Sequence, residues 1–341
     1  PEMAWPFAKF KAGTAVILTA GLVIACGGSS GTPTTPTDPG PGSGPFAFRA
    51  SPIDVALIHS IAPLGTVSAP SRWLPTDHLY FRFAEPSQSP VALRTSFFAP
   101  ADGTVRDVFS GAGSDVGVDI NVTATMTYRI GHLIPSVSLA RGTRVTAGQR
   151  LGTTGSSFDI DLSLFNDALT LFFVNPARAG NQVHTAAPLR YFEEPLRSQL
   201  YAKVQRFPPD LDGRVDFDVA GRLSGNWFTA DSIPLVFAYD SWDPAQVVIS
   251  VGGALMRTGI YTIAVGDPAP RDVSVSSGLV RYTLFAGPGR PGAPPPGTGL
   301  PGAAVARLLV EMLGPERIRV EMFSPSASAD AFTTDAKTFD R

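Results

Sequence analysis

Histidine and aspartate side chains at a few points in the chain could bind a divalent metal ion. Asp159 and Asp161 are separated by one residue in a stretch that predicts a β-strand, so both carboxylates lie on the same face. Imidazole nitrogens and carboxylate oxygens both bind divalent cations, so His78 and Asp161 are candidate metal ligands. Asp77 or His184 could complete the set. The simpler interpretation is that these residues lie on a solvated strand face and form no site.

The only cysteine, Cys26, follows a segment with the properties of an export signal. Lys9 and Lys11 precede residues 12–25, which carry no charge. This apolar run is long enough for the core of a signal peptide and short for a membrane span. It ends in Val-Ile-Ala-Cys-Gly, which resembles the lipobox of bacterial lipoproteins, in which the cysteine is lipidated. We therefore expect residues 1–25 to be a signal peptide and Cys26 to carry a lipid.

A lipid on Cys26 would make a membrane the first partner of this protein. Glycine follows the cysteine, which resembles lipoproteins sorted to the outer membrane, so we expect its periplasmic face if the cell has two membranes. Residues 26–45 are nearly all Gly, Ser, Thr and Pro after the cysteine and predict a flexible tether. The net charge of -2 provides no basic surface for nucleic acid, which is therefore not an expected partner.

The composition of the whole chain favours a mostly β protein. The 341 residues are 44% hydrophobic, which is enough for a sizeable core, and they include 34 glycines and 32 prolines, which favour many turns. Apolar and polar residues alternate over residues 118–130, as in a strand with one buried face. Residues 99–105 and 141–152 combine short strands with turn residues.

Three stretches of the first folded region follow an order that resembles a known enzyme family. They are residues 100–105 (Pro-Ala-Asp-Gly-Thr-Val), Tyr128 with residues 131–133 (Gly-His-Leu), and residues 145–155. In this order they resemble the β-sheet core of the lysostaphin/LytM-type zinc endopeptidases. The resemblance covers residues 75–164, about a quarter of the chain. It implies that residues 46–205 form a peptidase-like domain built on an antiparallel β-sheet.

The zinc ligands of that family are altered in this sequence. The family holds zinc with an H-x-x-x-D pair and the last histidine of an H-x-H pair, and other histidines assist proton transfer. His78 stands at the first ligand position, but Arg82 stands where the resemblance implies a carboxylate. A guanidinium has no lone pair to offer a metal. Asp159 and Asp161 occupy both histidine positions of the second pair, whereas His132 is retained among the assisting histidines.

Two interpretations of this altered set stay open. In the first, zinc is lost, no cofactor is bound, and Arg82 pairs with Asp159 or Asp161. The five residues His78, Arg82, His132, Asp159 and Asp161 would then line a binding groove. In the second, His78 and Asp161 keep zinc in a rearranged site, and His132 and Asp159 are the candidate catalytic residues.

Residues 206–341 predict a second β domain. Its clearest hairpin spans residues 307–323, where Ile, Val and Met alternate with charged residues after a Gly-Pro-Glu turn. Residues 215–219 predict a strand whose two aspartates face solvent. Together with further short apolar runs, this hairpin and this strand favour a small antiparallel barrel or sandwich. Pro and Gly dominate residues 287–302, which predict a long loop.

One motif of the second domain could contact a glycan. Arg222, Asn226 and Trp227 lie in the segment Gly-Arg-Leu-Ser-Gly-Asn-Trp-Phe. The tryptophan could stack on a sugar ring while Asn and Arg bind its hydroxyls. Packing of Trp227 in the core is the more ordinary interpretation.

Three classes of function are compatible with these patterns. The first is a non-catalytic envelope lipoprotein whose peptidase-like domain binds cell-wall material or a protein partner. The second is a zinc-dependent cell-wall endopeptidase with a rearranged metal site. The third is a structural or assembly factor of the envelope. Peptidoglycan or an envelope protein is thus the expected partner besides the membrane.

Overall fold

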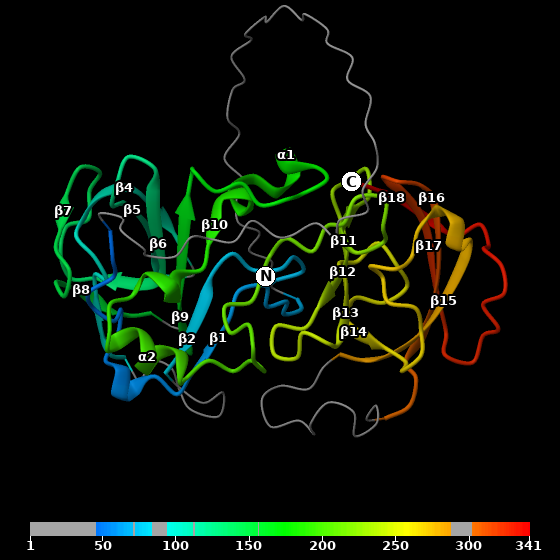
Figure 1. Ribbon diagram of the computed structural model, residues 1–341, viewed down its shortest axis with the longest axis horizontal. Coiled ribbons are helices and arrows are strands. Elements are labelled where there is room, and N and C mark those ends of the chain that lie inside the picture. Colours follow the sequence, from blue (N-terminus) through cyan, green and yellow to red (C-terminus); the bar gives the residue numbers. More distant parts are fainter. Residues whose placement is uncertain (1–45, 71, 84–93, 112, 156, 288–301) are drawn as a thin grey trace, which may run out of the picture.

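The computed structural model describes residues 46–70, 72–83, 94–111, 113–155, 157–287 and 302–341. The predicted signal peptide, Cys26 and the tether lie outside these residues, as does most of the predicted 287–302 loop. The described chain is mostly β, as predicted, with an antiparallel β-sheet followed by a closed antiparallel β-barrel (Figure 1). None of the helices in the described ranges is long and apolar enough to cross a membrane.

The first region is a ten-stranded antiparallel sheet over the described residues. Its strands are β1 (Ser60–Ala62), β2 (Leu79–Arg82), β3 (Ser96–Phe98), β4 (Gly103–Ser110), β5 (Val116–Asn121), β6 (Met126–Pro135), β7 (Arg144–Val145), β8 (Arg150–Thr154), β9 (Asp159–Asn166) and β10 (Thr185–Ala186). The main order is β1-β2-β9-β6-β5-β4-β7, β10 pairs with β9, and β8 pairs with β3 and β6. Strands β2, β9 and β6 are therefore neighbours although they are far apart in sequence.

The helices of the described chain are short, and most of them lie between β9 and the barrel. They are η1 (Val55–Leu57), α1 (Pro176–Ala179), η3 (Gly180–His184), η4 (Pro188–Tyr191), α2 (Leu196–Tyr201) and η5 (Val275–Ser277).

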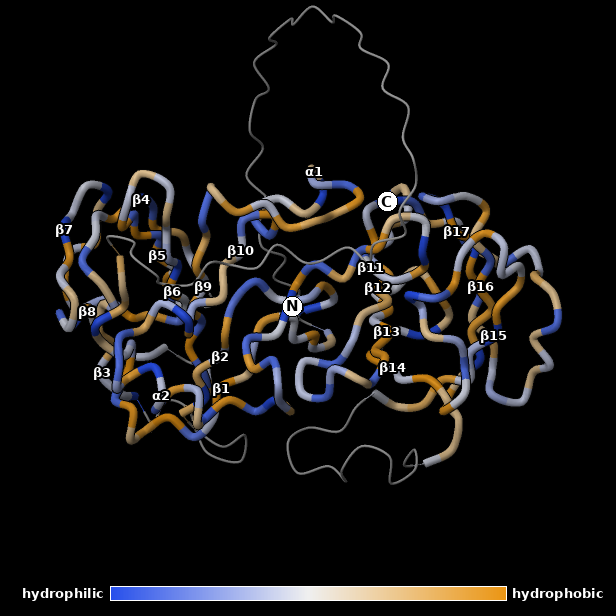
Figure 2. Tube along the Cα trace, viewed as in Figure 1, coloured by the Kyte–Doolittle hydropathy of each residue, from blue (hydrophilic) through white to orange (hydrophobic). Residues whose placement is uncertain are grey.

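The core of the first region is built from apolar side chains of the strands. Its fully buried residues include Phe81, Tyr128, Ile130, Ile160 and Leu162. Figure 2 shows the resulting alternation of hydrophobic and hydrophilic residues along the strands.

The predicted single strand over residues 118–130 is wrong, because the chain turns between β5 and β6. Thr123 Oγ1 accepts hydrogen bonds from the backbone N–H groups of Thr125 and Met126, at 3.2 and 3.0 Å. A threonine hydroxyl can stabilise such a turn without Gly or Pro. The alternation of apolar and polar residues continues through the turn, so periodicity alone did not reveal it.

The second region is a closed barrel, which decides between the predicted barrel and sandwich. Its strands are β11 (Gly225–Phe228), β12 (Pro234–Tyr239), β13 (Val247–Val251), β14 (Gly259–Ile263), β15 (Leu279–Ala286), β16 (Ala306–Gly314), β17 (Arg317–Phe323) and β18 (Lys337–Asp340). Each strand pairs antiparallel with the next, and β11 pairs with β18 to close the barrel. The predicted hairpin over residues 307–323 is confirmed as β16 and β17.

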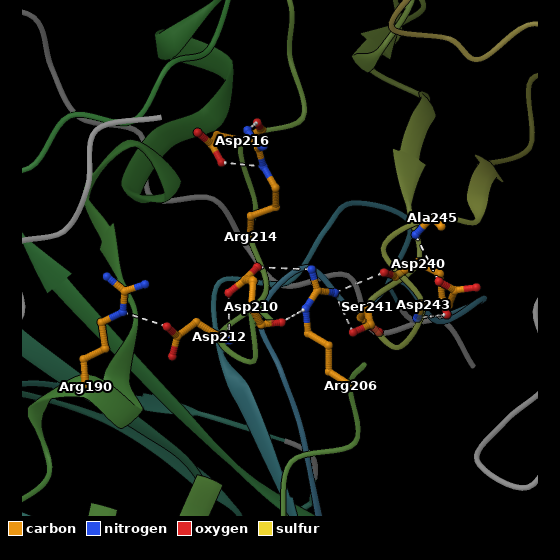
Figure 3. Close-up of polar contacts among 10 residues, drawn as sticks. All are labelled: Arg190, Arg206, Asp210, Asp212, Arg214, Asp216, Asp240, Ser241, Asp243 and Ala245. Atoms are coloured by element: carbon orange, nitrogen blue, oxygen red, sulfur yellow. Dashed lines mark hydrogen bonds and ion pairs between the residues drawn. The ribbon is translucent and has the colours of Figure 1, made fainter. Parts of the chain in front are cut away.

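A segment rich in Arg and Asp, residues 206–216, joins the sheet to the barrel (Figure 3). Arg206 donates hydrogen bonds to the carbonyl oxygens of Asp240 and Ser241, at 3.2 and 2.8 Å, in the loop between β12 and β13. Arg190 Nε, in η4, donates to the Asp212 carboxylate at 2.6 Å. Hydrogen bonds therefore run from this segment to both regions.

The predicted strand over residues 215–219 is wrong, and its aspartates are buried rather than solvated. Asp218 accepts hydrogen bonds from Val174 N at 2.9 Å and from Asn226 N at 2.8 Å, so it connects the first region with β11. Burial raises the pKa of the Asp218 carboxyl above its ordinary value. The pattern of residues could not show that another part of the chain covers this segment.

Candidate functional site

The polar residues of interest lie on one face of the first sheet. In the pairing of β2 with β9, Tyr80 lies opposite Asp161 and Arg82 lies opposite Asp159. Side chains alternate between the two faces of a strand, and the residues between these positions are buried in the core. The face that remains is half-buried and polar.

The imidazole of His78, immediately before β2, lies between two carboxylates. Its Nδ1 is 3.0 Å from Asp77 Oδ1, and its Nε2 is 3.8 Å from Asp161 Oδ2. Tyr80 packs edge to face against the imidazole, with ring centroids 4.7 Å apart. Burial opposes a positive charge on His78, but Asp161 and Asp77 outweigh it and hold the pKa above the ordinary value. The protonated imidazole is thereby favoured between the two carboxylates.

His132 reaches the same carboxylate from β6. The register between β5 and β6 shifts near this residue, and His132 has φ +62°, a left-handed conformation that is uncommon outside glycine. Its Nδ1 lies 3.4 Å from Asp115 Oδ2, and its Nε2 lies 3.6 Å from Asp161 Oδ2. The irregular backbone thus turns the His132 imidazole towards Asp161. In a regular strand this side chain would point elsewhere.

Asp161 is the centre of the cluster. Its Oδ1 and the Nε2 of His78 are buried without a hydrogen-bond partner in the described part of the chain. Gly131 leaves room for the carboxylate, since a Cβ there would lie 3.0 Å from Asp161 Oδ2. Buried polar atoms are rarely left without partners, so this cluster has hydrogen-bonding or metal-binding capacity that the described chain does not use.

Asp159 lies beside Asp161 on the same face and accepts a hydrogen bond from Ser157 Oγ. Burial and the neighbouring charge of Asp161 raise the pKa of the Asp159 carboxyl above its ordinary value. Two adjacent carboxylates favour a cation or a hydrogen-bond donor between them. His132, Asp159 and Asp161 each offer one ligand atom, and within the described ranges these three atoms all lie within 4.8 Å of one another.

Arg82 does not form the expected ion pair with Asp159 or Asp161 among the described residues. Its Nη1 donates to Gln205 Oε1 at 3.3 Å instead. Gln205 N also bonds to Ile61 O, which holds this glutamine beside β1. Because β1 and β9 flank β2 on opposite edges, an acceptor on the β1 side draws the guanidinium away from the aspartates.

The zinc set that the resemblance implies does not fit these residues. Arg82 stands at a ligand position and cannot bind a metal. Asp77, predicted as a further ligand, contacts Nδ1 of His78. His184, the other predicted addition, has its Nδ1 2.8 Å from the carbonyl oxygen of Leu169. A metal in this cluster would therefore need a different ligand set.

Sequence reasoning missed Asp115, the partner of His132. Its side chain is almost completely buried, and it lies between Gly113 and β5 with no motif around it. Gly155 belongs to the same arrangement: its N–H donates to His132 O at 2.6 Å, and a Cβ there would collide with the Asp115 carboxylate. In the sequence, only Gly155, a residue type that is common in turns, indicated this arrangement, and nothing indicated Asp115.

The residues predicted to contact a glycan do not form one surface. Trp227 is fully buried, its Nε1 donates to Leu223 O at 2.8 Å, and the Arg341 guanidinium lies 3.9 Å from its ring centroid. It therefore offers no ring face to a sugar. Asn226 lines a crevice between the two regions. Arg222 donates to Asp272 O at 3.2 Å in an exposed setting.

No family model and no curated protein matches this chain, but solved structures are similar to part of it. Csd3 from Helicobacter pylori is 16% identical, with a TM-score of 0.30, over 43% of this chain and 35% of Csd3. A zinc-containing peptidase from Vibrio cholerae is 19% identical, with a TM-score of 0.27, over 36% of this chain and 37% of the peptidase.

A third similar structure is the catalytic domain of the prophage-encoded protein EnpA from Enterococcus faecalis. It is 20% identical, with a TM-score of 0.23, over 44% of this chain and 94% of that domain. The chain spans about a third of the length of Csd3 and of the Vibrio cholerae peptidase. At TM-scores this low the likeness is local, and the activities in these names belong to those proteins.

Proposed function

We propose that this protein is a non-catalytic lipoprotein of the bacterial cell envelope whose peptidase-like domain binds cell-wall material. The observation that carries the proposal is the altered residue set of the predicted groove, which consists of His78, Arg82, His132, Asp159 and Asp161. Arg82 replaces a zinc-binding carboxylate and donates to Gln205, and aspartates stand at both positions of the H-x-H pair. The three motifs that resemble the LytM-type core support the class of domain.

The chemistry of the groove supports binding rather than hydrolysis. A zinc peptidase needs three protein ligands, an open position for the attacking water, and a nearby base for its proton. The ligand set of the resembling family is incomplete here. The groove nevertheless keeps two imidazoles and several carboxylates, some with unpartnered buried atoms. Such groups can accept from the amide and ammonium groups of a wall peptide and donate to its carboxylates.

The location in the envelope rests on the sequence before the folded part. A lipid on Cys26 would hold the protein at a membrane, and the tether would separate the sheet and barrel from the lipid headgroups. Labelling of cells that produce the protein with a palmitate analogue tests whether Cys26 carries a lipid. The expected result is labelled wild-type protein and unlabelled Cys26→Ala protein, and equal labelling of both would contradict the anchor.

Wall binding is tested by sedimentation of the purified full chain with peptidoglycan sacculi. We expect the protein to pellet with sacculi and to release no soluble wall fragments. Asp161→Asn should weaken the sedimentation, whereas Asp330→Asn, which removes an exposed carboxylate outside the groove, should not. Release of wall fragments would contradict the absence of catalysis. Binding to an envelope protein but not to sacculi would favour an assembly factor.

One observation favours a second function, a metallo-endopeptidase with a rearranged site. His132, Asp159 and Asp161 are close enough together to bind one ion. In that case, addition of zinc should produce fragments from sacculi, and His132→Gln should abolish their release. Wall binding without fragments in the presence of zinc would exclude this alternative.

A further inference from the structure

Two polar atoms at the junction of the sheet and the barrel are buried without a hydrogen-bond partner among the described residues. They are Oδ1 of Asn226 and Nε of Arg341, and each of these residues is only 7% exposed. Both side chains line the crevice between the first region and the barrel. Because proteins pair almost all of their buried polar atoms, an unpaired acceptor and an unpaired donor in one crevice indicate a partner from outside.

Strand β11 directs Asn226 into this crevice. Successive side chains of a strand point to opposite faces, so Trp227 packs in the barrel core while Asn226 and Phe228 lie on the outer face. Asp218 holds the strand in place, since its carboxylate accepts from Asn226 N and Val174 N. Oδ1 of Asn226 is therefore not needed to hold the strand and stays available to a ligand.

The Arg341 guanidinium is fixed by the chain with one N–H group left over. Its Nη1 donates to Val219 O at 3.0 Å, and its Nη2 donates to Arg222 O at 2.9 Å and to Ser224 O. The guanidinium also lies on the Trp227 ring, 3.9 Å from its centroid. Burial lowers the pKa of Arg341 to about 10, so the group stays protonated at neutral pH. Its Nε–H is a donor held in a fixed position.

The unpaired groups of the crevice match a neutral amide. Asn226 Oδ1 needs a donor and Arg341 Nε needs an acceptor, and an amide supplies both through its N–H and C=O groups. An anion would meet the Asp218 carboxylate and the Asn226 oxygen, whereas a cation would meet the Arg341 guanidinium. The crevice therefore disfavours ions of either sign.

Apolar side chains form part of the crevice wall. They are Leu74, Phe173 and Phe228, and the Arg178 guanidinium lies 4.9 Å from the centroid of the Phe228 ring. The crevice is open to solvent and has an empty volume of about 280 Å³, whereas pockets for drug-sized ligands begin at about 300 Å³. It therefore suits a small group with an apolar end, and the rest of such a ligand stays outside.

We propose that this crevice binds the acetamido group of an N-acetylated sugar. The N–H group donates to Asn226 Oδ1, the C=O group accepts from Arg341 Nε, and the methyl group contacts the apolar wall. The choice of a sugar among amide ligands rests on the proposed function, because the glycan of the cell wall carries acetamido groups. The crevice shares no residue with the groove, so this site is separate from it.

Titration of the purified full chain with two sugar oligomers, followed by calorimetry, tests the proposal. One is the β-linked tetramer of N-acetylglucosamine, and the other is the glucose tetramer, which has a hydroxyl in place of each acetamido group. We expect the N-acetylated tetramer to bind at least about 10-fold more tightly, since the glucose tetramer cannot pair both buried atoms. Equal binding of the two, or binding of neither, is expected if only water enters the crevice, and either result would overturn the proposal.

Variants locate the binding in the crevice. Asn226→Ala removes the acceptor and should weaken binding of the N-acetylated tetramer about 10-fold. Asn121→Ala is the matched control, because it removes an exposed amide of β5 outside the crevice, and it should bind like the wild type. Unfolding curves show whether each variant folds, and the comparison of the two oligomers on the wild type does not depend on the variants. Unchanged binding by folded Asn226→Ala would contradict the site.

The N-acetylated tetramer also separates the crevice from the groove and from the proposed function. Asp161→Asn should leave tetramer binding unchanged, and a loss of binding would place the sugar in the groove and overturn the crevice site. A chain that sediments with sacculi but binds no tetramer would overturn the crevice site and leave the proposed function standing. A chain that binds the tetramer through Asn226 but does not sediment with sacculi would support the crevice site and contradict wall binding.

Discussion

Two clusters of carboxylates in this protein, one buried at the junction and one half-buried in the groove, differ in how the chain pairs their oxygen atoms. At the junction of the sheet and the barrel, Asp212 accepts a hydrogen bond from Arg190 Nε at 2.6 Å (Figure 3). It also accepts one from the Tyr201 hydroxyl at 2.6 Å. Asp218 accepts from two backbone N–H groups at 2.8 and 2.9 Å. In the groove, the contacts of Asp161 with His78 and His132 are 3.6–3.8 Å long.

The difference separates a structural role from a binding role. A buried polar atom costs free energy unless it is paired, so a carboxylate that serves the fold is given its donors by the chain. The junction follows this rule at Asp212 and Asp218. The groove does not, since Asp161 Oδ1 and His78 Nε2 lack partners among the described residues. We infer that the junction holds the two regions together and that the groove receives something from outside.

Removal of the Asp218 carboxylate should have the largest effect on stability. Asp218→Ala leaves the N–H groups of Val174 and Asn226 without their acceptor, which we expect to lower the free energy of unfolding by about 3 kcal/mol. Chemical denaturation measures this change. The exposed Asp330→Ala should stay within about 0.5 kcal/mol of the wild type. Equal effects of the two variants would show that the Asp218 carboxylate does not hold the junction together.

The pH dependence of stability should report on the charge of His78 in the groove. The pKa of His78 is raised above 6.5 in the folded protein, so its interaction with Asp161 and Asp77 stabilises the fold fully below the unfolded pKa. This contribution is lost as the pH rises through the folded pKa. In metal-free protein, the stability advantage of the wild type over His78→Gln should therefore shrink between about pH 6 and the alkaline side of that pKa. Denaturation at a series of pH values would show it, and a difference independent of pH would contradict it.

The smallest expected effect concerns the backbone at His132. Glycine adopts a positive φ without strain, so His132→Gly should lose the groove function yet leave the stability nearly unchanged or raise it by up to about 1 kcal/mol. Ser232→Gly, at φ +63° outside the groove, provides the comparison. A large loss of stability in His132→Gly alone would show that this histidine supports the fold, which would contradict the binding role inferred for the groove.

The fold could be predicted in type but not in detail. Alternation and turn residues predicted a mostly β chain and the hairpin of β16 and β17, because both are local properties of a strand pair. The same alternation predicted one strand over residues 118–130, where a threonine-capped turn separates β5 from β6. It also predicted a strand over residues 215–219, because it cannot reveal which segments another part of the chain covers.

The sequence by itself determined the chemistry available to the site. It showed that Arg82 cannot bind a metal and that Asp159 and Asp161 share a strand face, since both follow from side-chain type and from the period of a strand. The tertiary structure decided which groups meet. Gln205 draws Arg82 aside, and the left-handed backbone at His132 turns its imidazole to Asp161. These contacts join segments far apart in the chain, and no local pattern encodes the distance between them.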